Sequence, residues 1–184
     1  MPEKLKDMFF TRESINNLAE TLKKYYPQFD TTKFIELIFD DNFDSLELKQ
    51  RMRHTTECMQ KTLPKNYKET LGILKKAIPH IKGFEAMSFP DYVEMYGMEN
   101  WDLSLPVLGY LTKYPSSEFA IRPFLDKDPK KVMSYMLKWA DDKDKKVRRF
   151  ASEGCRPRLP WTIALPKFKR DPLSHFADFG KVKK

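Results

Sequence analysis

Two short stretches of the sequence hold the side chains best suited to chemistry. Ser116–Phe124 reads Ser-Ser-Glu-Phe-Ala-Ile-Arg-Pro-Phe and contains Glu118. Val147–Trp161 reads Val-Arg-Arg-Phe-Ala-Ser-Glu-Gly-Cys-Arg-Pro-Arg-Leu-Pro-Trp and contains Glu153. A pair of carboxylates can stabilise positive charge that develops on a sugar, and one of them can orient a water molecule. The indole of Trp161 can stack on a sugar or on a cationic base.

Each of these residues also has a purely structural interpretation, which the residues by themselves leave open. Glu118 can interact with the first turn of its helix. Glu153 can pair with Arg149, four residues earlier on the same helix, and Trp161 can pack in the core.

Positive charge is concentrated in the same part of the chain. The whole sequence has a formal charge of +8, and between Lys143 and Arg170 ten residues are basic and two are acidic. Elsewhere basic and acidic side chains are equal in number, so the excess lies in this basic block. A concentrated basic strip is typical of a surface that binds a polyanion, because neutralised phosphates release condensed counterions. A solvated helix face is the alternative interpretation.

Several other kinds of chemistry have no support in the sequence. Cys58 and Cys155 are too few for a disulfide framework and too far apart for a metal knuckle. The histidines lack metal-ligand spacing and the glycines form no phosphate-binding loop, so we expect no metal and no cofactor. The sequence lacks both an export signal and an apolar run of the roughly 20 residues that a membrane span needs. We therefore expect a cytoplasmic protein with no membrane partner.

The elements that must position these residues are expected to be helices. After Thr11, a good N-cap, the apolar residues recur at the spacing of one helix face. Ser45 is expected to open a helix that runs towards Thr62, and Ser116 or Ser117 to cap a later one. In the second half, helices of about ten residues alternate with short polar turns. The pattern predicts an all-α fold of antiparallel helix pairs that stack into a curved superhelix, a solenoid.

The stretches Ser116–Phe124 and Val147–Trp161 closely resemble the AlkC branch of the AlkC/AlkD-like DNA alkylation-repair glycosylases, and the similarity extends to about Asp171. The resemblance implies a HEAT-like repeat fold. We expect a monomer, although the sequence pattern does not specify the oligomeric state. The resemblance also implies base-excision repair of alkylated double-stranded DNA, in which bases methylated on a ring nitrogen, such as 3-methyladenine and 3-methylcytosine, are removed without a metal. Such proteins bend the duplex along a concave basic surface, so no deep base pocket is expected.

The resemblance further implies roles for individual residues. Glu118 and Glu153 correspond to carboxylates that stabilise charge or orient water, and Trp161 corresponds to the stacking platform. Arg149 and Arg156 match positions that contact DNA near the lesion. General contacts with phosphates are expected from Lys145, Lys146, Arg148 and Arg158.

We expect a single domain over residues 1–172, with N-terminal helices in 1–100 and the motif-bearing repeats in 101–172. The resemblance fades after Lys169–Pro172 and residues 173–184 show no helical stripe, which suggests a C-terminally truncated chain. A frameshift within the codons for 175–184 is one hypothesis for this ending. A rival function is a non-catalytic HEAT-like module that binds DNA, RNA or an acidic protein through the basic block. A protein scaffold without a nucleic-acid role is a third possibility.

Overall fold

The computed structural model describes residues 5–170, and the regular secondary structure within them consists of helices joined by turns and loops. The chain divides into two compact units, Met1–Tyr96 and Gly97–Lys184. The prediction of an all-α fold is confirmed. Residues 173–184, on which the predictions of a non-family-like tail and of a frameshift depend, lie outside the described residues.

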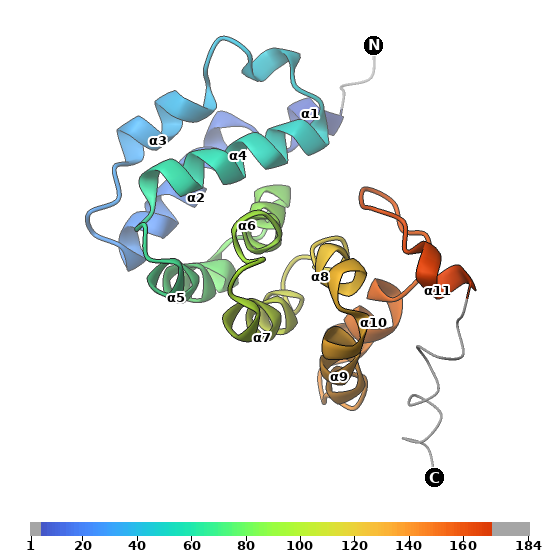
Figure 1. Cartoon of the computed structure of the whole chain (residues 1–184). Coiled ribbons are helices and arrows are strands. Elements are labelled where there is room, and N and C mark those ends of the chain that lie inside the picture. Colours follow the sequence, from blue (N-terminus) through green and yellow to red (C-terminus); the bar gives the residue numbers. More distant parts are fainter. Residues whose placement is uncertain (1–4, 171–184) are drawn as a thin grey trace. The chain divides into compact units, whose positions relative to one another are not determined.

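The first unit is a set of helices packed in pairs (Figure 1). Its α-helices are α1 (Leu5–Met8), α2 (Arg12–Tyr25), α3 (Thr31–Ile38), α4 (Leu48–Thr62), α5 (Tyr67–Ala77) and α6 (Ser88–Tyr96). Short 3-10 helices lie at η1 (Phe43–Ser45), η2 (Ile78–His80) and η3 (Phe84–Met87). Helix α2 packs against α3 and α5, and α4 packs against α3 and α6.

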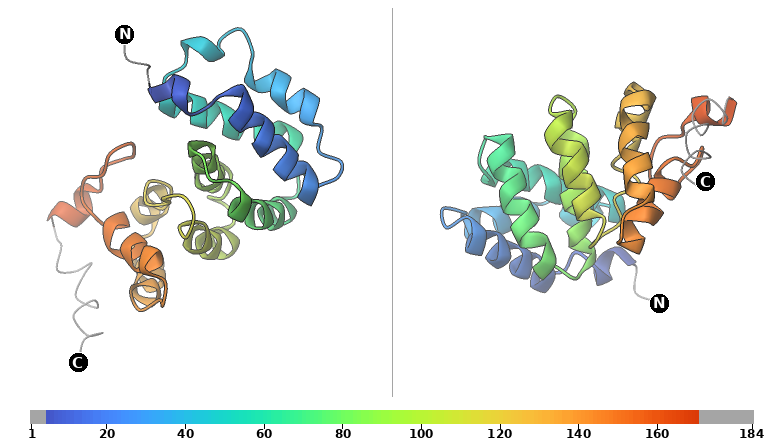
Figure 2. Two further views of the ribbon diagram at one scale, coloured as in Figure 1. Left: turned by 180° about the vertical axis from the view of Figure 1, so that it is seen from behind. Right: turned by 90° about the horizontal axis from the view of Figure 1, so that it is seen from below.

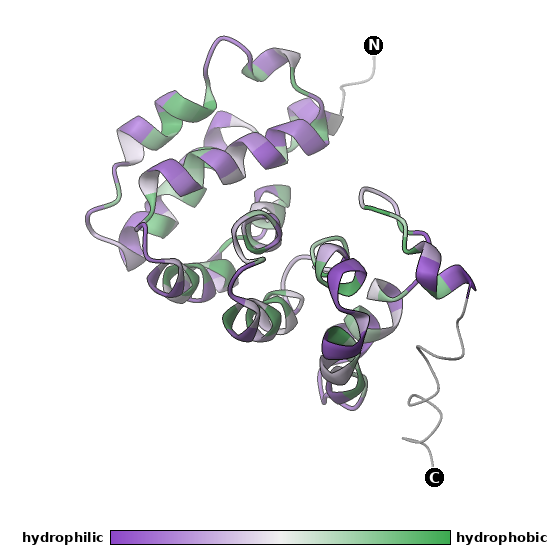
Figure 3. Ribbon diagram, viewed as in Figure 1, coloured by the Kyte–Doolittle hydropathy of each residue, from purple (hydrophilic) through white to green (hydrophobic). Residues whose placement is uncertain are grey.

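Helix α2 forms where the apolar spacing predicts it. The Thr11 hydroxyl accepts a hydrogen bond from the backbone N–H of Ser14 at 3.1 Å, which satisfies one of the free donors of the first turn. Ile15, Leu18 and Leu22 are fully buried along one face. Figure 3 shows both hydrophobic and hydrophilic residues on α2 and α4, as expected of helices that bury one side.

Helix α4 begins later than the sequence predicts, at Leu48 instead of Ser45. The Ser45 hydroxyl donates to the Asn42 carbonyl at 2.7 Å and closes the short helix η1. The start of α4 is fixed instead at the N-cap Glu47, whose backbone N–H donates a hydrogen bond to the side chain of Gln50 at 2.8 Å. This cap fixes the first turn three residues further along.

The second unit carries both sequence motifs. It contains α7 (Trp101–Leu111), α8 (Arg122–Lys127), α9 (Pro129–Ala140), α10 (Lys145–Gly154) and α11 (Pro166–Arg170). Helices α9 and α10 lie side by side in all three views of Figures 1 and 2, and α9 also contacts α7 and α8. Asp128 caps α9 and Asp144 caps α10, each by accepting a hydrogen bond from a backbone N–H of the first turn.

The core of the second unit fixes the orientation of α10. Val147 and Phe150 are buried on its inner face, and the Phe150 ring lies 5.1 Å from the Trp139 ring of α9. A Cβ atom on Gly109 of α7 would lie 2.7 Å from the Trp139 indole, so glycine is what allows this indole to approach α7. The opposite face of α10 carries the exposed residues Arg148, Arg149 and Ser152. Among the helices of residues 5–170, none is long and apolar enough to cross a bilayer.

Candidate functional site

Glu118 lies in the turn that connects α7 to α8, not in the first turn of a helix. The Ser116 hydroxyl and Arg149 Nη1 both donate to its carboxylate, the latter at 2.8 Å. The Glu118 side chain is 3% exposed and the Arg149 side chain is 63% exposed. Ser116 therefore orients this carboxylate within the turn. Neither Ser116 nor Ser117 caps the next helix as predicted, because α8 begins at Arg122. A buried carboxylate needs such a partner, because desolvation otherwise makes the charged form costly.

Glu153 is held by a different arginine from the one that the helical spacing suggests. Arg156 Nη1 lies 2.8 Å from Glu153 Oε2, while Arg149, on the same helix as Glu153, reaches across to Glu118. The Glu153 side chain is 29% exposed and the Arg156 side chain is 60% exposed. The site thus contains two ion pairs, each formed by one glutamate and one arginine. In each pair the carboxylate is less exposed than the guanidinium, and only the Glu118 carboxylate is buried.

The segment from Cys155 to Leu165 is a loop that carries Trp161. The Leu165 N–H donates to the Pro157 carbonyl at 2.9 Å, which closes the loop. The Thr162 hydroxyl donates to the Phe119 carbonyl at 3.0 Å, which attaches the loop to the turn of Glu118. The residues next to Trp161 and to Glu118 are therefore in direct contact.

Trp161 has two features that a core residue lacks. The residue is 42% exposed, so it lies at the surface of the loop. Its backbone φ is 69°, a left-handed conformation that is rare and strained for a bulky residue. Strain of this kind persists only where the surrounding structure enforces it, and it is concentrated at functional sites.

Arg122 binds main-chain carbonyls on both sides of Trp161, although the sequence pattern assigns it no role. Its guanidinium is fully buried and donates to four main-chain carbonyls of the loop region. Nε donates to Ile163 at 2.7 Å, Nη1 to Gly154 at 3.2 Å and to Arg156 at 2.5 Å, and Nη2 to Pro157 at 3.1 Å. Burial lowers the pKa of Arg122 from its usual value. The signal in the sequence is a lone charge in the otherwise apolar run Phe119–Leu125.

The remaining basic residues lie on the outside of α10 and the loop. Lys145 and Arg158 are exposed. Lys146 Nζ donates to the Lys113 carbonyl at 2.7 Å, and Arg148 Nη1 donates to the carbonyls of Asp142 and Lys143 at 2.8 and 3.0 Å. Lys146 and Arg148 therefore hold nearby turns while their charged ends stay at the surface.

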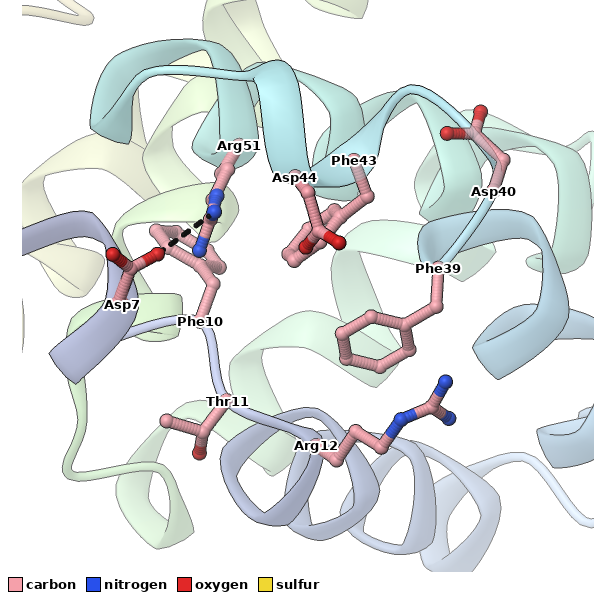
Figure 4. A pocket seen from close by; sticks show the side chains of 9 residues that line it. All are labelled: Asp7, Phe10, Thr11, Arg12, Phe39, Asp40, Phe43, Asp44 and Arg51. Carbon is pink, nitrogen blue, oxygen red and sulfur yellow. Dashed lines mark hydrogen bonds and ion pairs between the residues drawn. The ribbon is translucent and has the colours of Figure 1, made fainter.

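A separate cavity of about 330 Å³ lies in the first unit, and none of the predicted site residues lines it (Figure 4). Its lining contains two stacked cation and aromatic pairs, with Arg12 over Phe39 and Arg51 over Phe43, both at 4.5 Å. Arg51 also pairs with Asp7 at 3.0 Å. Within residues 5–170, His, Cys, Asp and Glu side chains form no group of three or more that could hold a metal ion.

Comparison with known proteins places this site in context. No protein-family model matches the chain. The chain is 43% identical over 163 residues to the uncharacterized protein YhaZ of Bacillus subtilis (strain 168), which covers 89% of this chain and 46% of YhaZ. It also matches the structure of the Pseudomonas fluorescens alkylpurine DNA glycosylase AlkC bound to DNA containing an abasic site analog. That match has a TM-score of 0.87 at 34% identity and covers 96% of this chain and 51% of the other. The chain thus spans about half the length of these proteins.

Proposed function

Since this chain is related to the AlkC-type proteins in both sequence and fold, we propose that it is a DNA glycosylase that removes N-methylated cationic bases. One observation carries the proposal. Glu118 is buried and held by Ser116 and Arg149 beside a loop that presents the exposed residue Trp161. The partner is double-stranded DNA with alkylated bases, which places the activity at the chromosome. The matched P. fluorescens glycosylase, bound to DNA with an abasic site analog, supports this choice of partner.

The chemistry required of the protein is modest. A base methylated on a ring nitrogen is cationic and is already a good leaving group. When the bond from the sugar C1′ to the base nitrogen breaks, the electron pair leaves with the base and positive charge develops on the sugar. Water then adds to C1′ and loses a proton, which leaves a free base and an abasic site. A fixed negative charge close to C1′ lowers the barrier.

The burial of the two carboxylates suggests how they divide this work. Glu118 is the more buried, so its charge acts through a medium of low dielectric and suits stabilisation of the sugar cation. Glu153 is partly exposed and can contact water, so we assign to it the orientation of the attacking molecule. Trp161 stacks against the sugar or the base, where its ring attracts positive charge.

The outward-facing arginines connect DNA binding to the carboxylates. A guanidinium binds a phosphate by two parallel hydrogen bonds. Phosphates that bind Arg149 and Arg156 compete with Glu118 and Glu153 for the same donors. DNA binding therefore loosens each ion pair and makes the carboxylate charge available to the sugar. Lys145, Lys146, Arg148 and Arg158 add contacts with the DNA backbone.

The experiment is single-turnover release of 3-methyladenine and 3-methylcytosine from methylated duplex DNA. We expect Glu118→Gln and Glu153→Gln each to reduce the rate by about 10²-fold or more while affinity for DNA is retained. Glu99→Gln is the matched control, because Glu99 is an exposed carboxylate in an ion pair with Lys127 elsewhere in the same unit. DNA binding without release by the unmodified chain would favour the non-catalytic module. Absence of salt-sensitive binding would favour a protein scaffold.

A further inference from the structure

We propose that Arg122 is a positioning residue for the proposed glycosylase reaction, and that it holds Trp161 in place by fixing the loop that carries it. The inference rests on the proposed function. It follows from where the four hydrogen bonds of Arg122 end. The carbonyls of Gly154, Arg156 and Pro157, which precede Trp161, accept three of these bonds. The carbonyl of Ile163, which follows Trp161, accepts the fourth.

The bonds of Arg122 connect two parts of the site that are distant in sequence. Arg122 is the first residue of α8 and directly follows the turn that holds Glu118. A short shift of the loop would break its bonds together with the nearby hydrogen bond from Thr162 to Phe119. One side chain thus sets the distance between the loop of Trp161 and the turn of Glu118.

The same bonds account for the strained backbone of Trp161. A left-handed φ of 69° is unfavourable for tryptophan and would relax if the loop were free. Carbonyls held on both sides of Trp161 remove that freedom. Pro157 and Pro160 restrict the chain further, because proline fixes its own φ. The conformation of the loop is therefore set before DNA binds, so less ordering entropy is lost on binding.

Arginine is the side chain that this task requires. Its planar guanidinium carries five N–H donors in a rigid fork, and four carbonyl contacts use this geometry. Lysine has three donors on a single nitrogen, so it cannot reach carbonyls on several sides at once. Within residues 5–170 the acceptors found for Arg122 are main-chain carbonyls, and their dipoles compensate the buried charge.

The test compares Arg122→Met and Arg122→Lys with Arg51→Met in the full chain. Arg51 is also a buried arginine, and it binds Asp7 and the Lys6 carbonyl in the first unit. The first readout is trypsin cleavage of the folded protein at the Arg158–Leu159 bond, because Arg156 precedes proline and resists trypsin. We expect Arg122→Met to accelerate this cleavage at least about tenfold. Arg122→Lys should lie between it and the unmodified chain, and Arg51→Met should leave cleavage at this bond unchanged.

The second readout is base release at saturating and at limiting DNA. A displaced Trp161 should lower the maximal single-turnover rate about tenfold or more, with a smaller change in the half-saturating DNA concentration. An Arg122→Met variant whose cleavage at Arg158–Leu159 and maximal rate match those of the unmodified chain would overturn the inference and leave the proposed function intact. If the unmodified chain releases no base, the proposed function fails, and trypsin cleavage alone still decides whether Arg122 holds the loop.

Discussion

At the scale of single residues, the site depends on the opposite exposure of the two members of each ion pair. Glu118 is almost completely buried and Arg149 is mostly exposed, at a distance of 2.8 Å. Such a pair contributes little to stability when it is replaced as a whole, but removal of one member leaves an unpaired charge. The partner that stabilises the carboxylate in the free protein is therefore also the group that we propose binds DNA phosphates.

This arrangement predicts a non-additive effect of mutations. Arg149→Met should lower the free energy of unfolding by roughly 1–3 kcal/mol, because Glu118 loses its compensating charge. Glu118→Gln in addition should recover part of that loss, since the amide carries no charge. Urea unfolding of the two single variants and the double variant measures the coupling. Simple additivity of the two single effects would show that the pair is not coupled.

The left-handed backbone of Trp161 predicts an inverted order of small residues at that position. At an ordinary position alanine is more favourable than glycine, but at φ 69° glycine avoids the clash of Cβ. Trp161→Gly should therefore be more stable than Trp161→Ala by about 1 kcal/mol. Both should lose base release, because both lack the indole. Thermal unfolding of the two variants tests the order, and a more stable alanine variant would contradict the strained backbone.

At the scale of secondary-structure elements, two helix contacts make distinct predictions. The first is the approach of α9 to α7, where the Trp139 indole lies over Gly109. Gly109→Ala would place a Cβ 2.7 Å from indole atoms, so overpacking should outweigh the gain in helix propensity. We expect a loss of roughly 1–3 kcal/mol in the free energy of unfolding.

Gly72 offers a matched control in the middle of α5. A Cβ there meets nothing within 4 Å, so Gly72→Ala should stabilise the chain by up to about 1 kcal/mol. Denaturant titrations of the two alanine variants should shift in opposite directions. A stabilising Gly109→Ala would mean that α7 and α9 are not in contact through this glycine.

The second contact joins α4 to α6 through a buried carboxyl group. Burial raises the pKa of Asp91 from its ordinary value of 3.8, although Arg53, with Nη2 at 2.8 Å from Oδ1, acts in the opposite direction. Burial also raises the pKa of the neighbouring Glu94. A carboxyl group with a raised pKa binds its proton more tightly in the folded chain than in the unfolded chain. Its contribution to stability is therefore complete below the unfolded pKa and is lost as pH rises through the folded pKa.

Asp91→Asn tests whether the contribution of Asp91 to stability falls as pH rises. Relative to the unmodified chain, the variant should gain stability as pH rises from below 3.8 towards neutrality, because it has no proton to release. Urea unfolding at several pH values measures the difference. Asp126→Asn, at an exposed position in the second unit, serves as the control and should follow the unmodified chain. A relative loss of stability with rising pH would show that the Arg53 ion pair dominates.

At the scale of the whole molecule, the basic block makes a prediction about salt. Each phosphate that the protein neutralises contributes about 0.9 to the slope of log affinity against log salt concentration. Loss of Lys145 and Arg158 together should therefore reduce that slope by roughly 1 to 2. The control pair is Lys127 and Lys131, which form ion pairs with Glu99 and Asp102. Substitution of these lysines should leave the slope unchanged, and an equal effect of both pairs would argue against a localised DNA surface.

The sequence predicts the helical fold well because its signals are local. The Thr11 cap and the apolar stripe of α2, and Asp128 with Pro129 at the start of α9, each lie within a few residues of the helix that they specify. It does not predict which arginine pairs with Glu118, because Arg149 is distant in sequence and the spacing on α10 favours Glu153. Arg122 stands out as a lone charge in the apolar run Phe119–Leu125, but its role is hidden for a similar reason. Its partners are main-chain carbonyls, which every residue possesses and which leave no pattern in the sequence.

The way in which Arg122 holds the loop has a consequence for how such a site can evolve or be redesigned. The guanidinium contacts carbonyls of Arg156, Pro157 and Ile163, and it makes no use of their side chains. The shape of the loop is therefore largely uncoupled from the chemical character of the residues that it displays. Arg158, Leu159 and Ile163 can be exchanged to present a different surface to a ligand while the backbone beneath them keeps its course. A library confined to these three positions would search recognition chemistry on a scaffold whose geometry one buried cation maintains.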